Sequence, residues 1–310
     1  MHRTVKSPIS ASDLRQGHFE RAAWCFLLSL VAVPCLVGAE NPVDPLFLHR
    51  SLAEAAEKAM DISTKTAHYK PLFGAGDSNQ TIVKSLARYG ELTVEPGGAS
   101  GIVGYSNEEQ LYYVLDGSGV LHYADQTASL KKNDFVYLPV GVQHGISNPT
   151  QSVCRVMIMG FKIPSDMKIA PTPKLVKSNL EDVSITAAHG PGTKFKHLLG
   201  DTCGRKDILA TANVLGCAFV MEFDPGINNY PHHHDTLEEV YFVLRGQGEI
   251  ATGGGPTGQE GRYPVKEGDA YFFRLNATVR FYRGPGKENP LILAVQSYYP
   301  FRRTGLAAIK

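Results

Sequence analysis

Short apolar runs separated by turn-forming residues dominate the chain after about residue 80. The runs are rich in β-branched and aromatic residues and place apolar side chains at alternate positions, which predicts β-strands. In the first half, the predicted strands cover residues 85–94, 111–115, 120–123, 135–138 and 152–161. In the second half, they cover residues 214–223, 239–244, 249–252, 270–273, 279–282 and 291–298. The pattern therefore indicates an all-β protein with two similar halves.

The N-terminal part has a different pattern. Ser51–Met60 is rich in alanine and glutamate, which predicts a short helix with Ser51 as its N-cap. Earlier, residues 22–37 form an apolar, uncharged run between a basic segment and the small pair Gly38-Ala39. This order is typical of a secretory signal peptide, cleaved here after Ala39. An uncleaved anchor is the weaker alternative, because a membrane span needs roughly 20 apolar residues. We therefore expect an exported protein, periplasmic or extracellular, with no stable membrane span after cleavage.

A candidate metal site lies in the second half. His232 and His234 are two residues apart, so in an extended chain both imidazoles point to the same side, whereas His233 points away. Glu239 begins the next predicted strand and can approach the same point. Two neutral imidazoles and one carboxylate suit a divalent transition metal such as iron, manganese, zinc or nickel. They would leave coordination positions open for a substrate.

The segment from Gly226 to Gly246 resembles the first signature motif of the cupin superfamily. That motif has a glycine, five residues, His-x-His, three or four residues, a glutamate, six residues and a second glycine. Glu238 also fits the tolerated spacing, but only Glu239 leaves six residues before Gly246. The resemblance implies a metal held by His232, His234 and the glutamate.

The second cupin motif is less complete in this half. It resembles the segment Gly268–Arg283, but Arg274 replaces the expected proline and Asn276 the expected glycine. Val279 occupies the position of the histidine ligand, and valine cannot coordinate a metal. Either a three-ligand site remains, with open positions, or the site is losing its metal. The first interpretation is favoured, because converging donors are costly to bury without an ion.

The same spacing recurs upstream between Gly97 and Gly117. There the ligand positions hold Val103, Tyr105 and Gln110. The second motif is well kept in this copy, with Pro139, Gly141, His144 and Asn148. An isolated histidine rarely holds a metal, so His144 is expected to be a core histidine or a polar contact for a small ligand. Two copies in one chain resemble a bicupin with a degenerate N-terminal cupin.

The resemblance implies two tandem cupin barrels (double-stranded β-helix, or jelly-roll, barrels), often with terminal strands exchanged. The expected organisation is a signal peptide at 1–39, an extension with a short helix at 40–80, a first cupin domain at 81–162, a connector at 163–200 and a second cupin domain at 201–310. The first domain is expected to be metal-free and the second to carry the metal.

Composition and net charge limit the kinds of binding partner to be expected. The chain has 310 residues, 43% hydrophobic and 20% charged, and a net charge of +1, so it suits two globular domains and gives no sign of nucleic-acid binding. The expected partner is a small molecule, and a homodimer stays open. Cys154 and Cys217 lie in apolar strand-like runs and are expected to be core thiols, whereas Cys203 lies in a loop.

Strand periodicity also suggests which side chains surround the metal. Tyr230 is expected to face inward with the two histidines and Tyr241 with Glu239, as candidate catalytic residues for proton transfer. Candidate substrate contacts are Arg274, Arg280 and Phe281. The resemblance implies dioxygenase, decarboxylase, isomerase or lyase chemistry on a small oxygenated molecule. The alternatives are a non-catalytic bicupin that binds a sugar or another small ligand, and a structural bicupin with neither metal nor ligand.

Overall fold

The structure is a computed structural model that describes residues 46–77, 82–169, 174–187, 192–200, 212–253, 260–283 and 287–298. Within these residues the regular structure is β, apart from a single 3-10 turn, η1 (Leu180–Asp182). The predicted signal peptide and Cys203 lie outside the described residues. The prediction of an all-β protein is confirmed.

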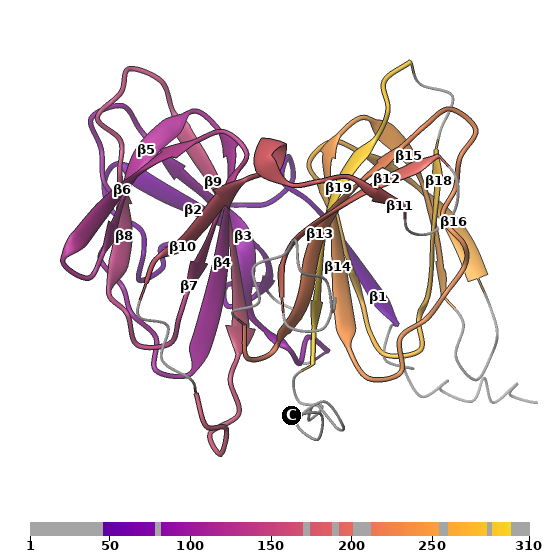
Figure 1. Ribbon diagram of the computed structural model, residues 1–310, viewed down its shortest axis with the longest axis horizontal. Coiled ribbons are helices and arrows are strands. Elements are labelled where there is room, and N and C mark those ends of the chain that lie inside the picture. The colour runs from indigo at the N-terminus through magenta and orange to yellow at the C-terminus, as the bar shows by residue number, and fades with distance from the viewer. Residues whose placement is uncertain are drawn as a thin grey trace, which may run out of the picture. The chain divides into compact units, whose positions relative to one another are not determined.

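The first barrel consists of two antiparallel sheets (Figure 1). Its strands are β2 (Ala67–Gly74), β3 (Leu86–Val94), β4 (Glu108–Asp116), β5 (Ser118–Tyr123), β6 (Gln126–Lys131), β7 (Asp134–Leu138), β8 (His144–Ser147), β9 (Cys154–Lys162) and β10 (Val176–Asn179). The larger sheet has the order β10-β7-β4-β9-β3-β2 and the smaller one β6-β5-β8.

The second barrel repeats this arrangement. Its strands are β1 (Phe47–Ser51), β11 (Thr186–Ala187), β12 (Thr193–Gly200), β13 (Leu215–Phe223), β14 (Glu238–Arg245), β15 (Gln247–Gly253), β16 (Glu260–Lys266), β17 (Asp269–Phe273), β18 (Thr278–Arg283) and β19 (Leu291–Ser297). The larger sheet has the order β1-β17-β14-β19-β13-β12-β11 and the smaller one β16-β15-β18.

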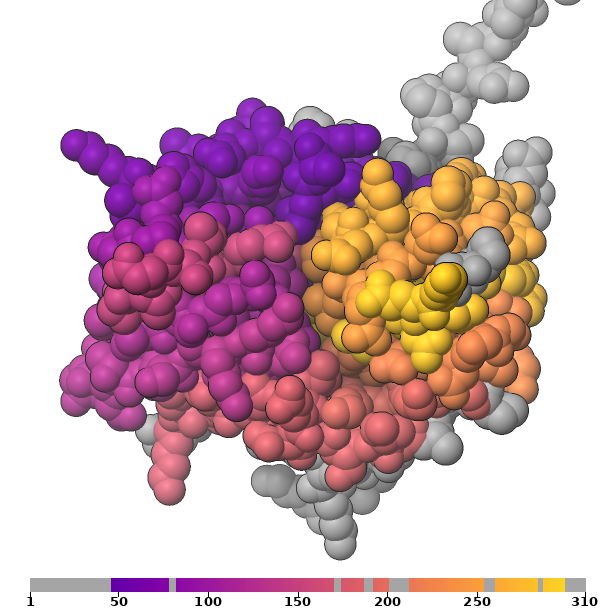
Figure 2. All heavy atoms as spheres, turned by 90° about the horizontal axis from the view of Figure 1, so that it is seen from above, coloured from indigo at the N-terminus to yellow at the C-terminus, as the bar shows by residue number. Residues whose placement is uncertain are grey.

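Each barrel receives an edge strand from the segment that precedes the other barrel. Strand β1 comes before the first barrel in the chain but pairs with β17 of the second. Strand β10 comes before the second barrel but pairs with β7 of the first. The rose-to-salmon connector that carries β10 contacts both the magenta and the orange parts of the chain in Figure 2. The strand exchange that the cupin resemblance implied is therefore present in both directions.

The eleven predicted strands all appear, with ends that differ by up to three residues. Within the described residues, some strands were not predicted, among them β1, β2, the polar β6 and the four-residue β8. As a result the first barrel begins at β2, within the predicted extension, and the predicted connector contains β10, β11 and β12. Polar strands escaped detection because they lack an apolar alternation of their own and are defined by their partners.

The predicted helix at Ser51–Met60 is wrong. Ser51 is the last residue of β1, and the next residue, Leu52, is buried and donates its backbone N–H to Gly268 O at 3.0 Å. A single turn follows, and Lys58 then forms a bridge to Tyr69. Helix propensity amounts to a few tenths of a kcal/mol per residue, and sheet pairing with burial of Leu52 outweighs it.

Alternation along each strand separates two kinds of core. On β14, Tyr241 and Val243 belong to the apolar cluster inside the second barrel. Val240 and Phe242, between them, belong to a cluster that also contains residues of the first barrel. Glu239 shares the inward parity of Tyr241, so the fold directs its carboxylate into the barrel.

The two cysteines differ. Cys154 is a buried free thiol, as expected. The prediction for Cys217 is wrong, because this residue is disulfide-bonded. Within the part of the chain that the structure describes, no helix is long and apolar enough to cross a membrane.

Candidate metal centre in the second barrel

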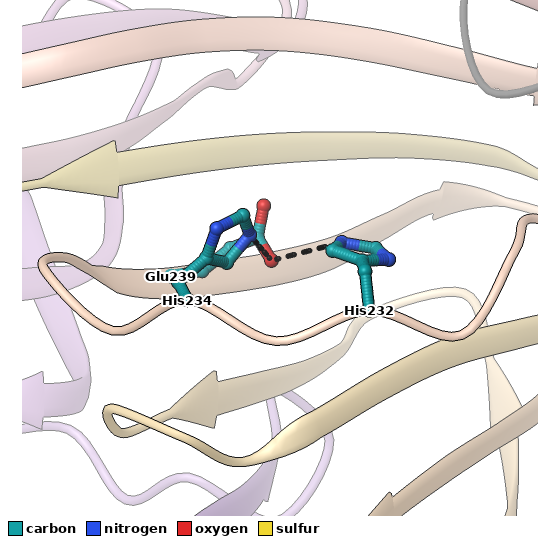
Figure 3. A group of neighbouring side chains, drawn as sticks. All are labelled: His232, His234 and Glu239. Atoms are coloured by element: carbon teal, nitrogen blue, oxygen red, sulfur yellow. Dashed lines mark ion pairs between the residues drawn. The ribbon is translucent and has the colours of Figure 1, made fainter.

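The two histidines lie on the segment that leads into β14, and Glu239 lies at the start of that strand (Figure 3). The segment is extended but not a regular strand. It is fixed by backbone bonds between His232 and Val279 of β18, at 3.2 and 2.8 Å, and by Asn276 N, which donates to His234 O at 2.8 Å. The histidine backbone is therefore held by the strand and turn that carry the second motif.

The three donors converge. Glu239 Oε2 lies 3.3 Å from His234 Nε2 and 4.0 Å from His232 Nε2. One donor atom from each residue lies within 4.8 Å of the others. The histidine side chains are partly exposed, whereas that of Glu239 is buried. The Glu239 carboxylate therefore lies inside the barrel, and the two imidazoles lie closer to the solvent.

The tautomer of His232 is set by its own backbone. Its Nδ1 lies 2.9 Å from the carbonyl oxygen of Tyr230, which can only accept a hydrogen bond. Nδ1 therefore carries the proton, and Nε2 offers its lone pair toward Glu239. Metal-binding histidines usually show this arrangement, in which the second nitrogen donates to a carbonyl or carboxylate.

The site needs a positive charge. Burial alone would lower the pKa of His234, but the negative charge of the adjacent Glu239 carboxylate outweighs it, so the pKa of His234 is raised. Glu239 Oε2 is buried and makes no hydrogen bond. A buried carboxylate oxygen facing imidazole lone pairs is unfavourable unless a proton or a metal ion lies between them. The residues present therefore fit a divalent cation.

The structure decides between the two glutamates. Glu239 points to the histidines, whereas Glu238 points away from them and accepts a hydrogen bond from Ser85 N at 2.6 Å. His233 is exposed between the two histidines of the site. The alternation expected for His-x-His therefore holds although the segment is not a regular strand.

The interior beside the site is apolar and aromatic. Tyr241, Val279 and Phe281 belong to its buried cluster, and Phe281 packs against Phe223 with ring centroids 4.8 Å apart. Burial raises the pKa of Tyr241 well above its ordinary value. This phenol therefore stays protonated at neutral pH, where it can donate a hydrogen bond but cannot serve as a base.

Three other candidates lie farther from the interior. The Tyr230 side chain is 63% exposed and does not face inward as expected. Arg280 packs on Tyr282, at 4.4 Å from its ring centroid, on the side of β18 opposite to Val279 and Phe281. Arg274 lies close enough to Glu238 for its charge to act on that carboxyl. The structure therefore does not bring Arg280 or the Tyr230 ring into the barrel.

One polar side chain in contact with the site, Gln296, is not among the site residues predicted from the sequence. Gln296, on β19, lies directly opposite Glu239 in the sheet, and its Nε2 is 2.8 Å from Glu239 Oε1. A signal for it existed, since Gln296 is the polar end of the alternating row Ile292, Ala294, Gln296. The row pointed to the interior, but the pairing with Glu239 is non-local.

Both barrels match a known protein family. A family model described as a cupin domain matches residues 90–160 and 219–295, one stretch in each barrel. The chain is a tandem cupin protein. The match covers the strands that carry both motifs and confirms the resemblance seen in the sequence.

Solved bicupin-like structures resemble this chain at low identity. Protein Ylba from E. coli, of the DUF861 family, has a TM-score of 0.61 and 16% identity, covering 85% of this chain and 96% of its own. A deletion mutant of Bacillus subtilis oxalate decarboxylase has a TM-score of 0.61 and 13% identity, covering 81% of this chain and 76% of its own. Another structure of the Bacillus enzyme concerns its Mn(II) centres. Such identities show the fold alone. No curated protein matches the chain.

In this tandem cupin, a histidine and a valine have changed places between the barrels. His232 forms a backbone bridge to Val279 in the second barrel, and Val103 forms the equivalent bridge to His144 in the first. Each barrel thus has an imidazole on one side of the bridge and a methyl pair on the other. The second barrel keeps the side that also carries His234 and Glu239.

A hydrogen-bonded cluster occupies the equivalent place in the first barrel. His144 is buried, with Nδ1 2.8 Å from Val142 O and Nε2 2.9 Å from Gln110 Oε1. The Gln110 amide in turn bonds to Glu108. Arg88 completes the cluster, with its Nε 2.8 Å from Glu108 and Nη1 2.9 Å from Asp61. A fixed guanidinium therefore supplies the positive charge near these groups.

Proposed function

We propose that this bicupin is a metal-dependent enzyme that acts on a small oxygenated molecule in its second barrel. The metal would be a divalent transition ion, iron, manganese, zinc or nickel, held by His232, His234 and Glu239. The reaction would be of the dioxygenase, decarboxylase, isomerase or lyase type. The observation that carries the proposal is the buried Glu239 oxygen that makes no hydrogen bond and faces two imidazole nitrogens.

A bound ion would polarise a carbonyl or carboxylate of the substrate, or activate oxygen. The chain's own residues provide the rest of the site. Tyr241, with its raised pKa, could donate a hydrogen bond to a substrate oxygen. Phe281 and Val279 would contact the apolar part of the substrate and exclude water, because both are buried in the interior cluster. Tyr230 could cover the mouth, since its backbone already contacts His232.

Manganese and small carboxylates are the first choices for trial. The Bacillus protein of similar fold is an oxalate decarboxylase with Mn(II) centres. Oxalate and other small oxo- and hydroxycarboxylates therefore form a reasonable first panel for this chain.

The second candidate is a non-catalytic bicupin that binds a sugar or another small ligand. It is favoured by Val279, which removes the usual histidine ligand from the second motif. This candidate predicts ligand-dependent stabilisation that survives removal of metal. The enzyme predicts that chelation abolishes both turnover and metal-dependent stabilisation.

We also propose that the chain is exported to the periplasm or the cell exterior. The proposal rests on the basic, apolar and small-residue order before residue 40. The disulfide at Cys217 supports it, because disulfides persist mainly in oxidising compartments. The expected partner is a small molecule.

Metal content tests the main proposal. Mass spectrometry on protein purified without chelator should find near-stoichiometric metal in the wild type and little in His232→Ala or Glu239→Gln. His233→Ala is the matched control, because this exposed neighbour should leave the metal content unchanged. If folded wild type binds none of the four metals, even after incubation with each, the binding protein becomes the better candidate.

A further inference from the structure

The second motif of the second barrel lacks its usual histidine ligand. Val279, at the position of the usual histidine ligand, is buried in the apolar interior cluster and has no donor atom. A fourth protein donor, if the site has one, must come from another strand. The side chain in contact with two of the three donors is the best candidate.

Gln296 has that position. It lies directly opposite Glu239 in the antiparallel pair of β14 and β19, so the two side chains emerge on the same face of the sheet. Its Nε2 is 2.8 Å from Glu239 Oε1 and 3.4 Å from His234 Nε2. The preceding residues of the same parity, Ile292 and Ala294, belong to the interior cluster. The amide therefore ends the inward row of β19 beside the metal donors.

The amide can present either end to the site. Its terminal torsion has two broad minima that exchange the oxygen and the nitrogen. Without a cation, the NH2 group faces the Glu239 carboxylate. A divalent ion among the donors would repel the NH2 group and attract Oε1, and amide oxygens are good ligands for manganese-like ions. A half-turn about one bond would bring Oε1 toward the ion.

The first barrel offers an internal comparison. There Gly160 pairs with Gln110, as Gln296 pairs with Glu239. A Cβ atom at Gly160 would come within 2.5 Å of Glu108 Oε1 and 2.9 Å of Arg88 Cγ. In the first barrel, the ion pair of Arg88 and Glu108 thus occupies the space that corresponds to the Gln296 side chain. The second barrel, which has the converging metal donors, has the Gln296 amide at this place instead of the Arg88 guanidinium.

We propose that Gln296 is the fourth protein ligand of the second barrel, with Oε1 bound to the metal in place of the imidazole that Val279 lacks. The inference rests on the proposed metal site and extends its ligand set. It also predicts a ligand set of two nitrogens and two oxygens, which suits manganese or iron.

Two variants separate coordination from support of Glu239. Gln296→Met fills similar space without nitrogen or oxygen, and a thioether is a poor ligand for Mn(II). Gln296→Glu keeps an oxygen donor but removes the N–H that bonds to Glu239. The probe is Mn(II) itself, titrated into metal-free protein with the free ion measured by electron paramagnetic resonance. Thermal unfolding in chelator checks that each variant folds.

If Gln296 coordinates, the Mn(II) dissociation constant should rise by at least about 10- to 100-fold in Gln296→Met. In Gln296→Glu it should stay equal or fall. Equal loss in both variants would show that Gln296 only donates to Glu239, and unchanged binding in Gln296→Met would show no role. Either result overturns the inference but leaves the three-ligand site. If wild type binds no metal, the proposed function and the inference fail together.

Discussion

Glu109 and Glu238 occupy equivalent positions of the two repeats, and each carboxylate bonds to the backbone of the opposite barrel. Glu109 Oε1 accepts from Val214 N and Leu215 N at 2.8 and 2.7 Å. Glu238 Oε2 accepts from Ser85 N at 2.6 Å, at the corresponding place before β3. Both side chains are buried. Glu109 of the first barrel therefore binds the start of β13 in the second barrel. Glu238 of the second barrel binds the residue directly before β3 in the first.

Replacing these carboxylates should destabilise the protein unequally. Glu109 uses both oxygens, since Oε2 also accepts from Asn213 N at 2.8 Å and from Tyr137 at 2.7 Å. Glu109→Gln turns one acceptor into a donor that faces other donors, so the free energy of unfolding should fall by about 1–3 kcal/mol. Glu238→Gln can keep its main acceptor and should cost less. Urea unfolding measures both, with the exposed Glu54→Gln as control. Equal effects would contradict the asymmetry.

Metal should stabilise the second barrel. A ligand at 100 times its dissociation constant adds about 2.7 kcal/mol to the native state, which corresponds to a rise in Tm of roughly 4 °C for a chain of this size. Addition of chelator should remove this rise in the wild type and in His233→Ala. Glu239→Gln should have no metal-dependent rise, because the buried carboxylate is lost. A chelator-sensitive Tm in Glu239→Gln would place the ion elsewhere.

His144 should make stability depend on pH in the acid range. Burial lowers the pKa of His144 from 6.5 to about 4. Between these values the unfolded state binds the proton and the native state does not. The contribution of His144 to the free energy of unfolding is therefore fully present above about pH 6.5. It is lost as the pH falls toward 4, and the total loss is about 3 kcal/mol.

The neighbours of His144 require a difference measurement. Burial raises the pKa of Glu108 despite the nearby Arg88, and this acts in the opposite sense with pH. His144→Val copies the residue of the second barrel and leaves Glu108 in place. The difference in unfolding free energy between wild type and variant should shrink between pH 6.5 and 4.5. A difference that stays constant over this range would show that His144 titrates normally.

The motif glycines should differ in their tolerance of substitution. Gly97 and Gly117 both have a positive φ, +72° and +73°. A Cβ at Gly97 would meet nothing within 4 Å, whereas one at Gly117 would collide with the carbonyl oxygen of Val153. Gly97→Ala should cost about 1–2 kcal/mol from backbone strain alone. Gly117→Ala should cost clearly more, because the backbone at Val153 must move. Thermal or urea unfolding measures the difference, and similar losses would contradict it.

Much of the fold followed from local patterns. Alternation predicted the buried strands, because a strand with one face in a core carries that face in its own sequence. The repeat predicted two barrels, since Gly97 and Gly117 reproduce the spacing of Gly226 and Gly246. The helix at Ser51–Met60 failed for the opposite reason. Its composition favours a helix, but pairing of β1 with β17, more than 200 residues away, decided its conformation.

The site divides in the same way. The sequence alone determined the convergence of His232, His234 and Glu239, because their spacing and strand parity place all three on one side of the chain. Only the tertiary structure brought Gln296 to Glu239 and put Arg88 with Glu108 into the space that faces Gly160. It also directed Arg280 away from the barrel interior. These relationships depend on which strands pair and in what register, and register is set by packing of the whole barrel, which no local pattern records.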